Sequence, residues 1–483
     1  MAYKTTIGLE IHVELKTKSK MFCSCSNNAL EKTPNTNICP VCMGHPGTLP
    51  VINEEAVNKV AKTGLALRGK ISENSKFDRK NYFYPDLPKG YQISQYDLPI
   101  SQGGFLKIGD KEIRITRVHL EEDTGRLVHP VGEKYSLVDF NRAGIPLMEL
   151  VTEPDISSAE EARKFAQELQ LILRYLNVSD ADMEKGQMRV EANISVSETK
   201  ALGTKVEIKN LNSFRAVEKG IEYEVKRQEE VLTKGKKVVQ ETMGWDDAKG
   251  QTYSQRLKEE AHDYRYFPEP DLPPLHFTAL EIKELAASLP ELPQARRERL
   301  KKEYRLLDQE AEMFIGNKSL AEYFEKVVSE FDPRLSQDQL FGLIKLAVNY
   351  LTSDLQGLLR GNSINQSFKI TPENFAEFIA LILQGQISSK IAKVVLVEMF
   401  ETGADPSNII EAKGLVQIVD EKELEKIIAE IISKNKPAVD DYKKGKETAV
   451  QFLIGQIMAQ TKGKANPKTA QDVLLQLLTK EKE

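Results

Sequence analysis

Four cysteines, the only ones in the chain, lie close to the N-terminus as Cys23, Cys25, Cys39 and Cys42. Two close pairs separated by one loop have the spacing of a tetrahedral zinc site. Two disulfide bonds are the alternative, but the chain has neither an apolar signal core nor an apolar run long enough to span a bilayer. We therefore expect a reducing, cytoplasmic location, which favours thiolate ligands. Because four thiolates leave no open position, zinc should stabilise the fold, and the chemistry must lie elsewhere.

The segment EIHVEL is a second candidate site. In a strand, alternation places Glu10, His12 and Glu14 on one face and the apolar residues between them on the other. Two carboxylates flanking an imidazole form a good surface for a divalent cation. Taken alone, however, this segment fits better as a solvated strand face on which His12 bonds a neighbouring carboxylate.

Further acidic residues strengthen the case for a site. The segment RVHLEEDTGR brings together His119, Glu121, Glu122 and Asp123. Like charges repel, so a solvated surface seldom needs three adjacent acids beside a strand. More acids, amides and cations follow at Asp139, Asn141, Arg142, Glu149, Arg189, Glu191, Asn193, Glu207, Lys209, Asn210, Asn212 and Ser213.

These side chains together suit phosphoryl transfer. Magnesium takes oxygen ligands from one or two carboxylates and leaves positions for water and phosphate. Lysine and arginine can hold phosphates, and positioning with charge neutralisation supplies most of the catalysis. The chain lacks a G-x-x-x-x-G-K-[ST] phosphate loop and a G-x-S-x-G serine motif. Any use of ATP therefore requires a different nucleotide cradle.

Two segments rich in tyrosine, FDRKNYFYPDLPKGYQISQ and AHDYRYFPEPDLPP, crowd basic, aromatic and amide side chains between prolines. A polar loop of this density is more often a functional site than a packing element. A structural loop rich in tyrosine is the alternative for both segments.

The chain has 483 residues, of which 40% are hydrophobic and 29% charged, with a formal net charge of -5. This composition is ordinary for a globular protein, and the net charge neither indicates nor excludes nucleic-acid binding. The length predicts about three domains. We place their limits at 1–292, 293–405 and 406–483, because runs of prolines and of Gly, Pro and Asn interrupt the pattern there.

The elements that must position these residues change in type along the chain. Alternating runs such as MRVEANISV and TKVEIKN predict strands in the first domain, with helices such as SSAEEARKFAQELQLILRYL between them. Apolar stripes in SLAEYFEKVVSEF and around Leu424 predict helices afterwards. The predicted fold class is α+β: a largely antiparallel, cradle-like catalytic domain with a zinc-binding insertion, an all-α domain and a small helical tail domain.

The tail is rich in lysine, and its glycines let the backbone approach a ligand. The lysines concerned are Lys443, Lys444, Lys446, Lys462, Lys464 and Lys468. Because no aromatic stacking platform accompanies them, this pattern favours recognition of RNA shape and phosphates rather than bases. A solvated basic surface on a small helical domain is the alternative.

Several long motifs occur in one order and together resemble a known family. They are EIHVEL, FCSC with CPVCMGHPGTLPV, FDRKNYFYPDLPKGYQISQ, HLEEDTGR, DFNRAGIPLMELV, EIKNLNSF and AHDYRYFPEPDL, followed by KGKETAVQFLIGQIMAQTKGKANP. Over essentially its whole length, the chain resembles the family of B subunits of aspartyl/glutamyl-tRNA(Asn/Gln) amidotransferases.

The resemblance implies a heterotrimer in which the A subunit is an amidase (glutaminase) and the C subunit is small. The amidase releases ammonia from glutamine. The B subunit uses ATP and Mg²⁺ to phosphorylate the side-chain carboxylate of misacylated Glu-tRNA(Gln) or Asp-tRNA(Asn), and ammonia then displaces the phosphate. The tail resembles the tRNA-binding domain of that family, which assigns its lysines to tRNA. Zn²⁺ completes the implied cofactors.

The resemblance also implies roles for individual residues. It assigns Glu10, His12, Glu121 and Glu149 to the metal and phosphoryl site, with Glu122 and Glu191 as further magnesium candidates. It assigns to the substrate and ammonia path Lys89, Tyr82, Tyr91, Asn141, Arg142, Asn210 and Ser213. Two departures from the family pattern occur, because Glu191 replaces an aspartate and Gln255 stands where methionine is common.

Two other interpretations remain open. A non-catalytic, zinc-containing tRNA-binding scaffold would explain the cysteines and the basic tail but not the carboxylates on the strand faces. A free small-molecule kinase would have no use for the GKANP tail. ATP consumption that depends on aminoacylated tRNA separates the three. The sequence does not say whether glutamate, aspartate or both are the physiological esters.

Overall fold

The computed structural model describes residues 3–28, 33–257, 263–362, 364–365, 367–415, 421–443, 445–446, 448–461, 465 and 467–480. The chain divides into two compact units, Met1–Pro293 and Gln294–Glu483. The predicted α+β class, with a mainly antiparallel sheet followed by helices, is confirmed. The three finer domain limits stay a prediction. Within the ranges given above, no helix is long and apolar enough to cross a membrane.

A ten-stranded sheet organises the first unit, in the order β15-β14-β13-β12-β1-β11-β8-β6-β2, with β7 paired to β8. Its strands are β1 (Lys4–Glu14), β2 (Lys70–Ile71), β6 (Ser101–Gln102), β7 (Phe105–Ile108), β8 (Lys111–Glu122), β11 (Pro146–Thr152), β12 (Met188–Ser197), β13 (Val206–Leu211), β14 (Glu241–Asp246) and β15 (Gln251–Leu257). Of the described pairings in this sheet, β13 with β14 is parallel and the others are antiparallel.

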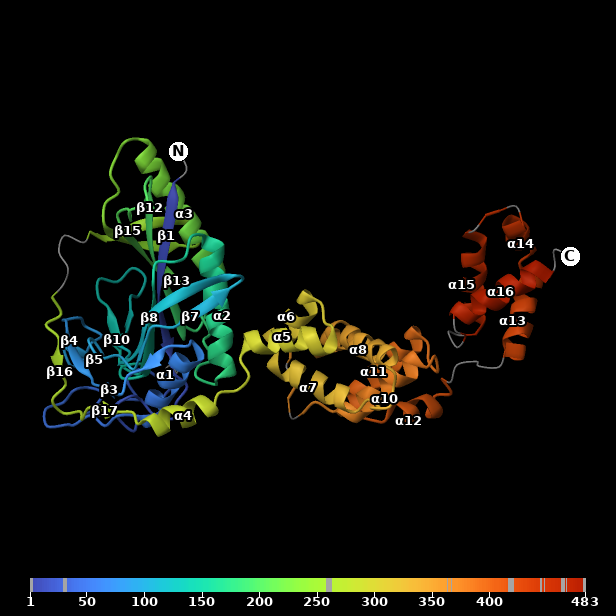
Figure 1. Ribbon diagram of the computed structural model, residues 1–483, viewed down its shortest axis with the longest axis horizontal. Helices are drawn as coiled ribbons and strands as arrows, with labels where there is room; N and C mark the ends of the chain where they lie inside the picture. Colours follow the sequence, from blue (N-terminus) through green and yellow to red (C-terminus); the bar gives the residue numbers. More distant parts are fainter. Residues whose placement is uncertain are drawn as a thin grey trace. The chain divides into compact units, whose positions relative to one another are not determined.

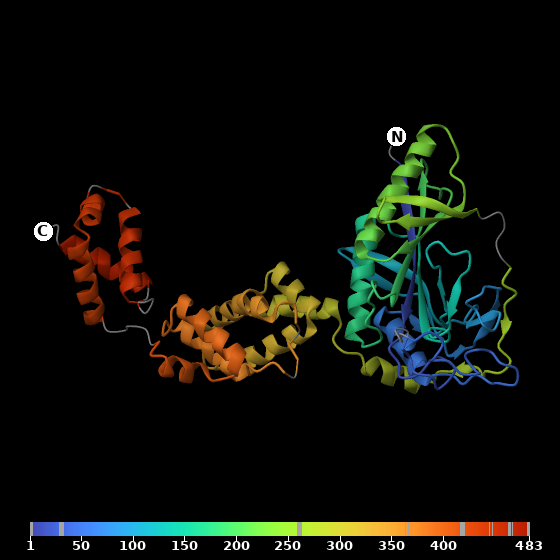
Figure 2. The same ribbon diagram turned by 180° about the vertical axis from the view of Figure 1, so that it is seen from behind.

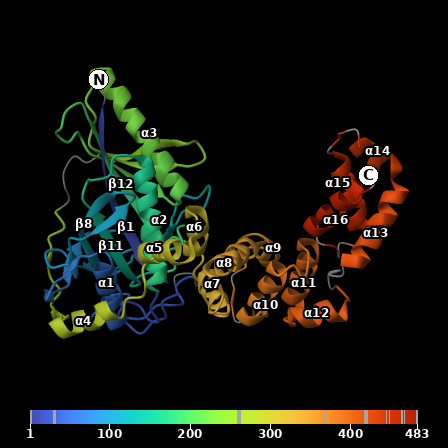
Figure 3. The same ribbon diagram turned by 45° about the vertical axis from the view of Figure 1, so that its right-hand side comes forward.

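Helices cover one face of this sheet, as Figures 1 and 3 show for α2 and α3. The helices are α1 (Glu54–Ala66), α2 (Ala159–Tyr175) and α3 (Phe214–Thr233). Ile11 and Val13 of β1 belong to the same buried cluster as Phe165 of α2 and Val217 of α3. Because side chains alternate along a strand, the polar residues of EIHVEL face the other way, as the sequence predicts. Ser158 caps α2 by accepting from Glu161 N at 3.1 Å.

The two tyrosine-rich segments meet in a three-stranded sheet. In it, β4 (Asp78–Asn81) lies between β5 (Tyr91–Ser94) and β16 (Phe267–Pro268). Arg79 of β4 makes a two-pronged ion pair with Glu269, at 2.7 and 2.8 Å, and Glu269 is buried. Two further pairs complete the strands: β3 (Asn74–Ser75) with β17 (Leu275–His276), and β9 (Arg126–Val128) with β10 (Leu137–Asp139).

The second unit is helical in the residues that the structure describes (Figures 1 and 2). After α4 (Ala279–Ala287) of the first unit come α5 (Pro293–Tyr304), α6 (Asp308–Gly316), α7 (Lys318–Ser329), α8 (Gln337–Thr352), α9 (Asp354–Leu359), α10 (Pro372–Leu383), α11 (Ser389–Thr402), α12 (Pro406–Ala412), α13 (Glu421–Lys434), α14 (Lys436–Lys443), α15 (Thr448–Gln460) and α16 (Pro467–Lys480). The predicted apolar stripes are buried, for example Phe324 of α7 and Ile428 of α13.

Candidate functional site

Three adjacent strands bring the predicted acidic residues together on the polar face of the sheet. The register aligns His12 of β1 with Glu149 of β11, and Glu149 with His119 of β8. His12 Nε2 lies 3.3 Å from Glu149 Oε2, 3.7 Å from Glu121 Oε1 and 3.9 Å from Glu10 Oε1. His119 Nε2 lies 3.6 Å from Glu149 Oε2 and 3.7 Å from Glu121 Oε2. The imidazole rings of His12 and His119 thus lie among the carboxylates of Glu10, Glu121 and Glu149.

The close packing of these groups shifts their pKa values. Burial alone would lower the pKa of His12, but its hydrogen bond to Glu149 and the nearby carboxylates raise it to about 9. The pKa of Glu149 falls below its ordinary value despite burial, because His119 and His12 stabilise the carboxylate. Burial and the charge of Glu149 raise the pKa of Glu10. The cluster therefore brings a protonated imidazole, that of His12, next to an ionised carboxylate, that of Glu149.

Cations border the cluster. Arg117 Nη2 donates to Glu149 Oε1 at 3.3 Å, and Lys209 Nζ donates to Glu191 Oε2 at 2.6 Å. Lys80 keeps a raised pKa despite burial, because Glu121 and other nearby anions stabilise its charge. These side chains could hold the oxygens of an anionic substrate beside the carboxylates.

Three overlapping groups in the cluster have donor atoms close enough to share an ion. They are Glu10, His12 and Glu149; His119, Glu121 and Glu149; and Glu10, Glu191 and Glu207, with donor atoms within 4.8 Å of one another in each group. Carboxylate oxygens are the ligands that Mg²⁺ prefers, so the donor set fits this ion. Glu191 reaches the edge of the cluster opposite Glu10 on β12.

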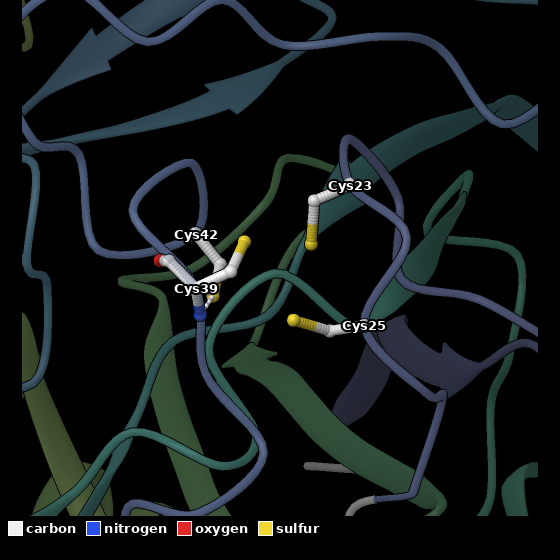
Figure 4. Close-up of side chains that lie close together, drawn as sticks. All are labelled: Cys23, Cys25, Cys39 and Cys42. Atoms are coloured by element: carbon white, nitrogen blue, oxygen red, sulfur yellow. Dashed lines mark hydrogen bonds between the residues drawn. The ribbon is translucent and has the colours of Figure 1, made fainter.

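The four cysteines converge from two loops, as Figure 4 shows. Their Sγ atoms lie within 4.8 Å of one another, and none of the four is in a disulfide. Cys39 N donates to Cys42 Sγ at 3.1 Å. The ammonium group of the fully buried Lys20 lies 3.9 Å from Cys42 Sγ. A tetrathiolate zinc centre carries excess negative charge, so this set of soft donors beside a buried cation fits Zn²⁺.

Comparison with known proteins agrees with this architecture. The model of the GatB/GatE catalytic domain matches residues 5–283, and that of the GatB domain matches residues 322–478. The chain is 49% identical to the B subunit of the aspartyl/glutamyl-tRNA(Asn/Gln) amidotransferase of Caldanaerobacter subterraneus subsp. tengcongensis, over 99% of this chain and 100% of the relative. It is similar to those of Thermotoga sp. (49%; 99% of each chain) and Persephonella marina (48%; 99% and 100%). The chain belongs to this family of B subunits.

Lys89 and Glu122 form an ion pair with each other, and neither is among the hydrogen-bond or ion-pair partners of His12 given above. Lys89 Nζ is paired with both carboxylate oxygens of Glu122, and Ile93 N donates to Glu122 Oε1 at 2.9 Å. Tyr91 lies beneath the Lys89 ammonium, 5.8 Å from it to the ring centroid. Glu121 and Glu122 are neighbours in β8, so alternation places their side chains on opposite faces, although β5 donates to both, from Ser94 to Glu121 and from Ile93 to Glu122. Glu122 is thus not one of the residues whose donor atoms converge with those of His12.

Asn141 and Arg142 anchor loops. Asn141 accepts from Asn37 N at 2.8 Å and donates to Thr33 O at 2.7 Å, which ties it to the segment between the cysteine pairs. Arg142 donates to Gly125 O at 2.8 Å. These contacts are compatible with a structural role for both side chains.

Tyr82, Asn210 and Ser213 occupy other places. Tyr82 packs edge-on against Tyr264, and burial raises its pKa. Asn210 and Ser213 line a separate open hollow of about 580 Å³ beside Trp245, where Ser213 caps α3. Of the other residues predicted for the path, Tyr91 lines a cavity with Lys89, whereas Asn210 and Ser213 line a different hollow.

Of the predicted tRNA-binding lysines, Lys444, Lys462 and Lys464 lie outside the described residues. Lys443 ends α14, and Lys446 follows it with its Nζ 3.0 Å from Asp441 Oδ1. Lys468 lies in the first turn of α16. Their role stays a prediction.

The sequence pattern placed His119 beside the acids without giving it a role, and it did not single out Arg117, Lys80 or Ser94. Arg117 was detectable, because it precedes His119 and Glu121 at two-residue spacing on the same strand. Ser94, which donates to Glu121 Oε2 at 3.1 Å, and Lys80 come from the tyrosine-rich hairpin β4–β5. The sequence pattern does not predict where the side chains of Ser94 and Lys80 point, because that depends on how the hairpin packs on the sheet.

Proposed function

We propose that this chain is the kinase and transamidase subunit of an ATP-dependent aminoacyl-tRNA amidotransferase, an enzyme that forms C–N bonds. Its substrates are Glu-tRNA(Gln), Asp-tRNA(Asn) or both, and its products Gln-tRNA(Gln) and Asn-tRNA(Asn). The observation that carries the proposal is the cluster in which His12 and Glu10, both partly buried, meet the buried Glu121 and Glu149. A solvated sheet surface would not bury so many like charges, whereas a site for phosphoryl transfer requires them.

The proposed reaction has two steps, phosphorylation of the carboxylate and amidation of the acyl phosphate. In the first, an oxygen of the substrate's side-chain carboxylate bonds to the γ-phosphorus of ATP, and the bond to the β-bridging oxygen breaks, which releases ADP. In the second, ammonia attacks the carbonyl carbon of the acyl phosphate and phosphate leaves, while the surplus proton passes to solvent or a base. Activation is needed because a carboxylate is a poor acyl donor and an acyl phosphate has a good leaving group.

The residues of the cluster divide these tasks. Glu10, His12, Glu121 and Glu149 would hold Mg²⁺, which when bound neutralises charge on the transferred phosphoryl group. Arg117, Lys80 and Lys209 border the same cluster and would orient anionic oxygens. The cysteines would hold Zn²⁺ as a structural ion.

The ammonia would come from partner subunits. We infer that an amidase, the A subunit, hydrolyses glutamine and that a small C subunit completes the heterotrimer, because the relatives are themselves named as B subunits. Lys89, Tyr91 and Glu122 line one cavity of about 210 Å³ and are candidates for the path of ammonia. The lysine-rich C-terminal helices would contact the tRNA.

The decisive experiment measures ATP cleavage by the assembled complex. We expect ADP release to require misacylated tRNA and to match amide formation when glutamine is present. Correctly acylated tRNA serves as the control. ADP release that is absent with every misacylated tRNA, although the tRNA binds, would instead identify a non-catalytic scaffold. Comparing Glu-tRNA(Gln) with Asp-tRNA(Asn) identifies the ester that the enzyme uses.

A further inference from the structure

The loop that carries the second cysteine pair packs directly on Lys89. Gly44 follows Cys42 by two residues and has a φ of +66°, which L-residues rarely adopt. A Cβ atom at Gly44 would overlap Lys89 Cγ and lie 3.2 Å from both Lys89 Cα and Lys89 Cβ. The backbone of the cysteine loop thus occupies the space beside the stem of Lys89, and it can do so because residue 44 has no side chain.

The same loop forms one wall of a cavity whose other wall carries the Lys89–Glu122 ion pair. Cys42, Gly44 and Gly47 line this cavity of about 210 Å³ together with Lys89 and Glu122. Gly144 closes the gap between the two walls, because a Cβ there would lie 3.4 Å from Cys42 Cβ and 3.8 Å from Glu122 Oε2. The metal centre and the ion pair therefore share one packed boundary.

We propose that the metal-bound cysteine loop positions Lys89, with Gly44 as the contact that holds the lysine stem against Glu122. Lys89 has four rotatable side-chain bonds, so its ammonium needs a fixed stem to stay in one place. The backbone N–H groups of residues 43–45 donate within the segment itself, for example Met43 N to Cys39 O at 3.1 Å and His45 N to Pro40 O at 2.9 Å. Metal ligation at both ends of the Cys39–Cys42 turn would therefore fix the position of Gly44.

The inference has a functional consequence: zinc occupancy would control the cavity proposed for ammonia. Only this consequence rests on the proposed function. The physical part of the inference is independent of catalysis. The Lys89 side chain is 10% exposed, and the ion pair with Glu122 covers its ammonium. If the loop withdraws, the ammonium becomes accessible to an amine-specific acylating reagent.

The first test measures acylation of Lys89 by peptide mass spectrometry in the full-length chain, with the exposed Lys164 as internal reference. Gly44→Ala should raise labelling of Lys89 at least about fivefold. Gly47→Ala is the matched control, because Gly47 also has a positive φ (+82°) in this loop but no atom within 4 Å of the position of its Cβ. It should leave labelling of Lys89 near the unsubstituted level. Equal labelling in the two variants would overturn the proposal.

Removal of the metal provides a second test that needs no substitution and so covers the case in which Gly44→Ala does not fold. Treatment of the unsubstituted chain with a thiolate-competing chelator should raise labelling of Lys89 relative to Lys164, and added Zn²⁺ should reverse it. Labelling that is insensitive to zinc content would show that the loop holds Lys89 without the ion, which contradicts the proposal.

The consequence is tested in the assembled complex by comparing glutamine with ammonium chloride as nitrogen donor. Gly44→Ala should lower amide formation from glutamine several-fold more than amide formation from ammonium chloride. Gly103→Ala should affect both equally, because Gly103 also has a positive φ (+67°) with no described atom within 4 Å of its Cβ position but does not line this cavity. If the unsubstituted complex shows no tRNA-dependent ATP cleavage, the proposed function fails. If that complex is active and the two glycine variants behave alike with both donors, only the positioning role of Gly44 fails.

Discussion

At the scale of single residues, the cluster depends on how His12 offsets charges that would otherwise repel. Its imidazole lies within 3.3–3.9 Å of three carboxylates. At pH 7 the raised pKa keeps it protonated, so an imidazolium ion can balance the charge that a divalent cation would otherwise neutralise. The same carboxylates that raise its pKa are the ones that would take part in binding the cation.

We predict that His12→Ala lowers tRNA-dependent ATP cleavage on the order of 100-fold or more, because it removes a ligand and leaves buried acids without a partner. Glutamine hydrolysis by the amidase partner should persist. ADP release is measured at limiting Mg²⁺, with Lys16→Ala as control, since Lys16 pairs with the exposed Asp180 on the surface. Unchanged amide formation by His12→Ala would remove His12 from the site.

The pH dependence of cation binding follows from the same shift. The pKa of His12 is raised from 6.5 to about 9, so the unfolded chain loses the proton near pH 6.5, whereas the folded protein keeps it at pH 7 and loses it as the pH rises through about 9. The stability that this proton contributes is therefore present at low pH and lost over that window. A cation that uses the neutral imidazole must displace the proton, so Mg²⁺ affinity should increase between pH 7 and 9. Calorimetry in two buffers of different ionisation enthalpy should detect one released proton, and the release should vanish in His12→Ala.

At the scale of elements, local sequence patterns predict which side chains share a strand face, but they do not predict which strands pair with one another. The alternation in EIHVEL is enough to separate Glu10 and His12 from the buried Ile11. It does not reveal that β13 is separated from β8 by three intervening strands, or that Asn210 and Lys89 line different cavities. Nor does it show that β16, far along the chain, pairs with β4. Such long-range pairings depend on the packing of the whole sheet.

The ion pair between Arg79 and Glu269 should control the attachment of β16. Glu269→Ala removes the buried carboxylate that accepts twice from Arg79 and leaves the guanidinium only Asp271, 3.6 Å away, as an ion-pair partner among the described residues, which costs about 1–3 kcal/mol. We expect amide exchange at Asn81, whose N–H donates to Tyr264 O at 2.9 Å, to rise on the order of 100-fold. The control is Asp155→Ala, because its partner Arg114 is 66% exposed and solvent screens such a pair. Equal exchange in the two variants would contradict this prediction.

Asn141 offers a test of whether a predicted path residue acts through the cysteine loop. Asn141→Ala removes the part-buried bonds to Asn37 N and Thr33 O, at about 0.5–1.5 kcal/mol each. We therefore expect zinc affinity to fall about tenfold. Asn210→Ala, predicted for the same path but located in another hollow, should retain zinc. Elemental analysis after dialysis against a chelator measures both, and full zinc retention by Asn141→Ala would favour a direct role in the path.

At the scale of the whole molecule, the C-terminal helices form a core of their own. The buried apolar side chains of α13–α16 belong to one cluster drawn from residues 424–478. The boundary predicted at 406 would cut away α12, which packs on α10 and α11 and buries Ile409 and Ile410. A truncated chain that keeps α12 packed on α10 and α11 should therefore end at Leu415.

We predict that a chain ending at Leu415 folds but binds tRNA more weakly. The lost lysines would each contribute about 0.7–0.9 to the slope of log affinity against log salt, so the slope should flatten along with the affinity. Binding of ATP, assigned to the first unit, should be unchanged and serves as the control for folding. Nitrocellulose filter binding at several salt concentrations measures both quantities. Full-length affinity with an unchanged slope would place the tRNA contacts in the first 415 residues, and the lysines of the tail would then form an ordinary solvated surface.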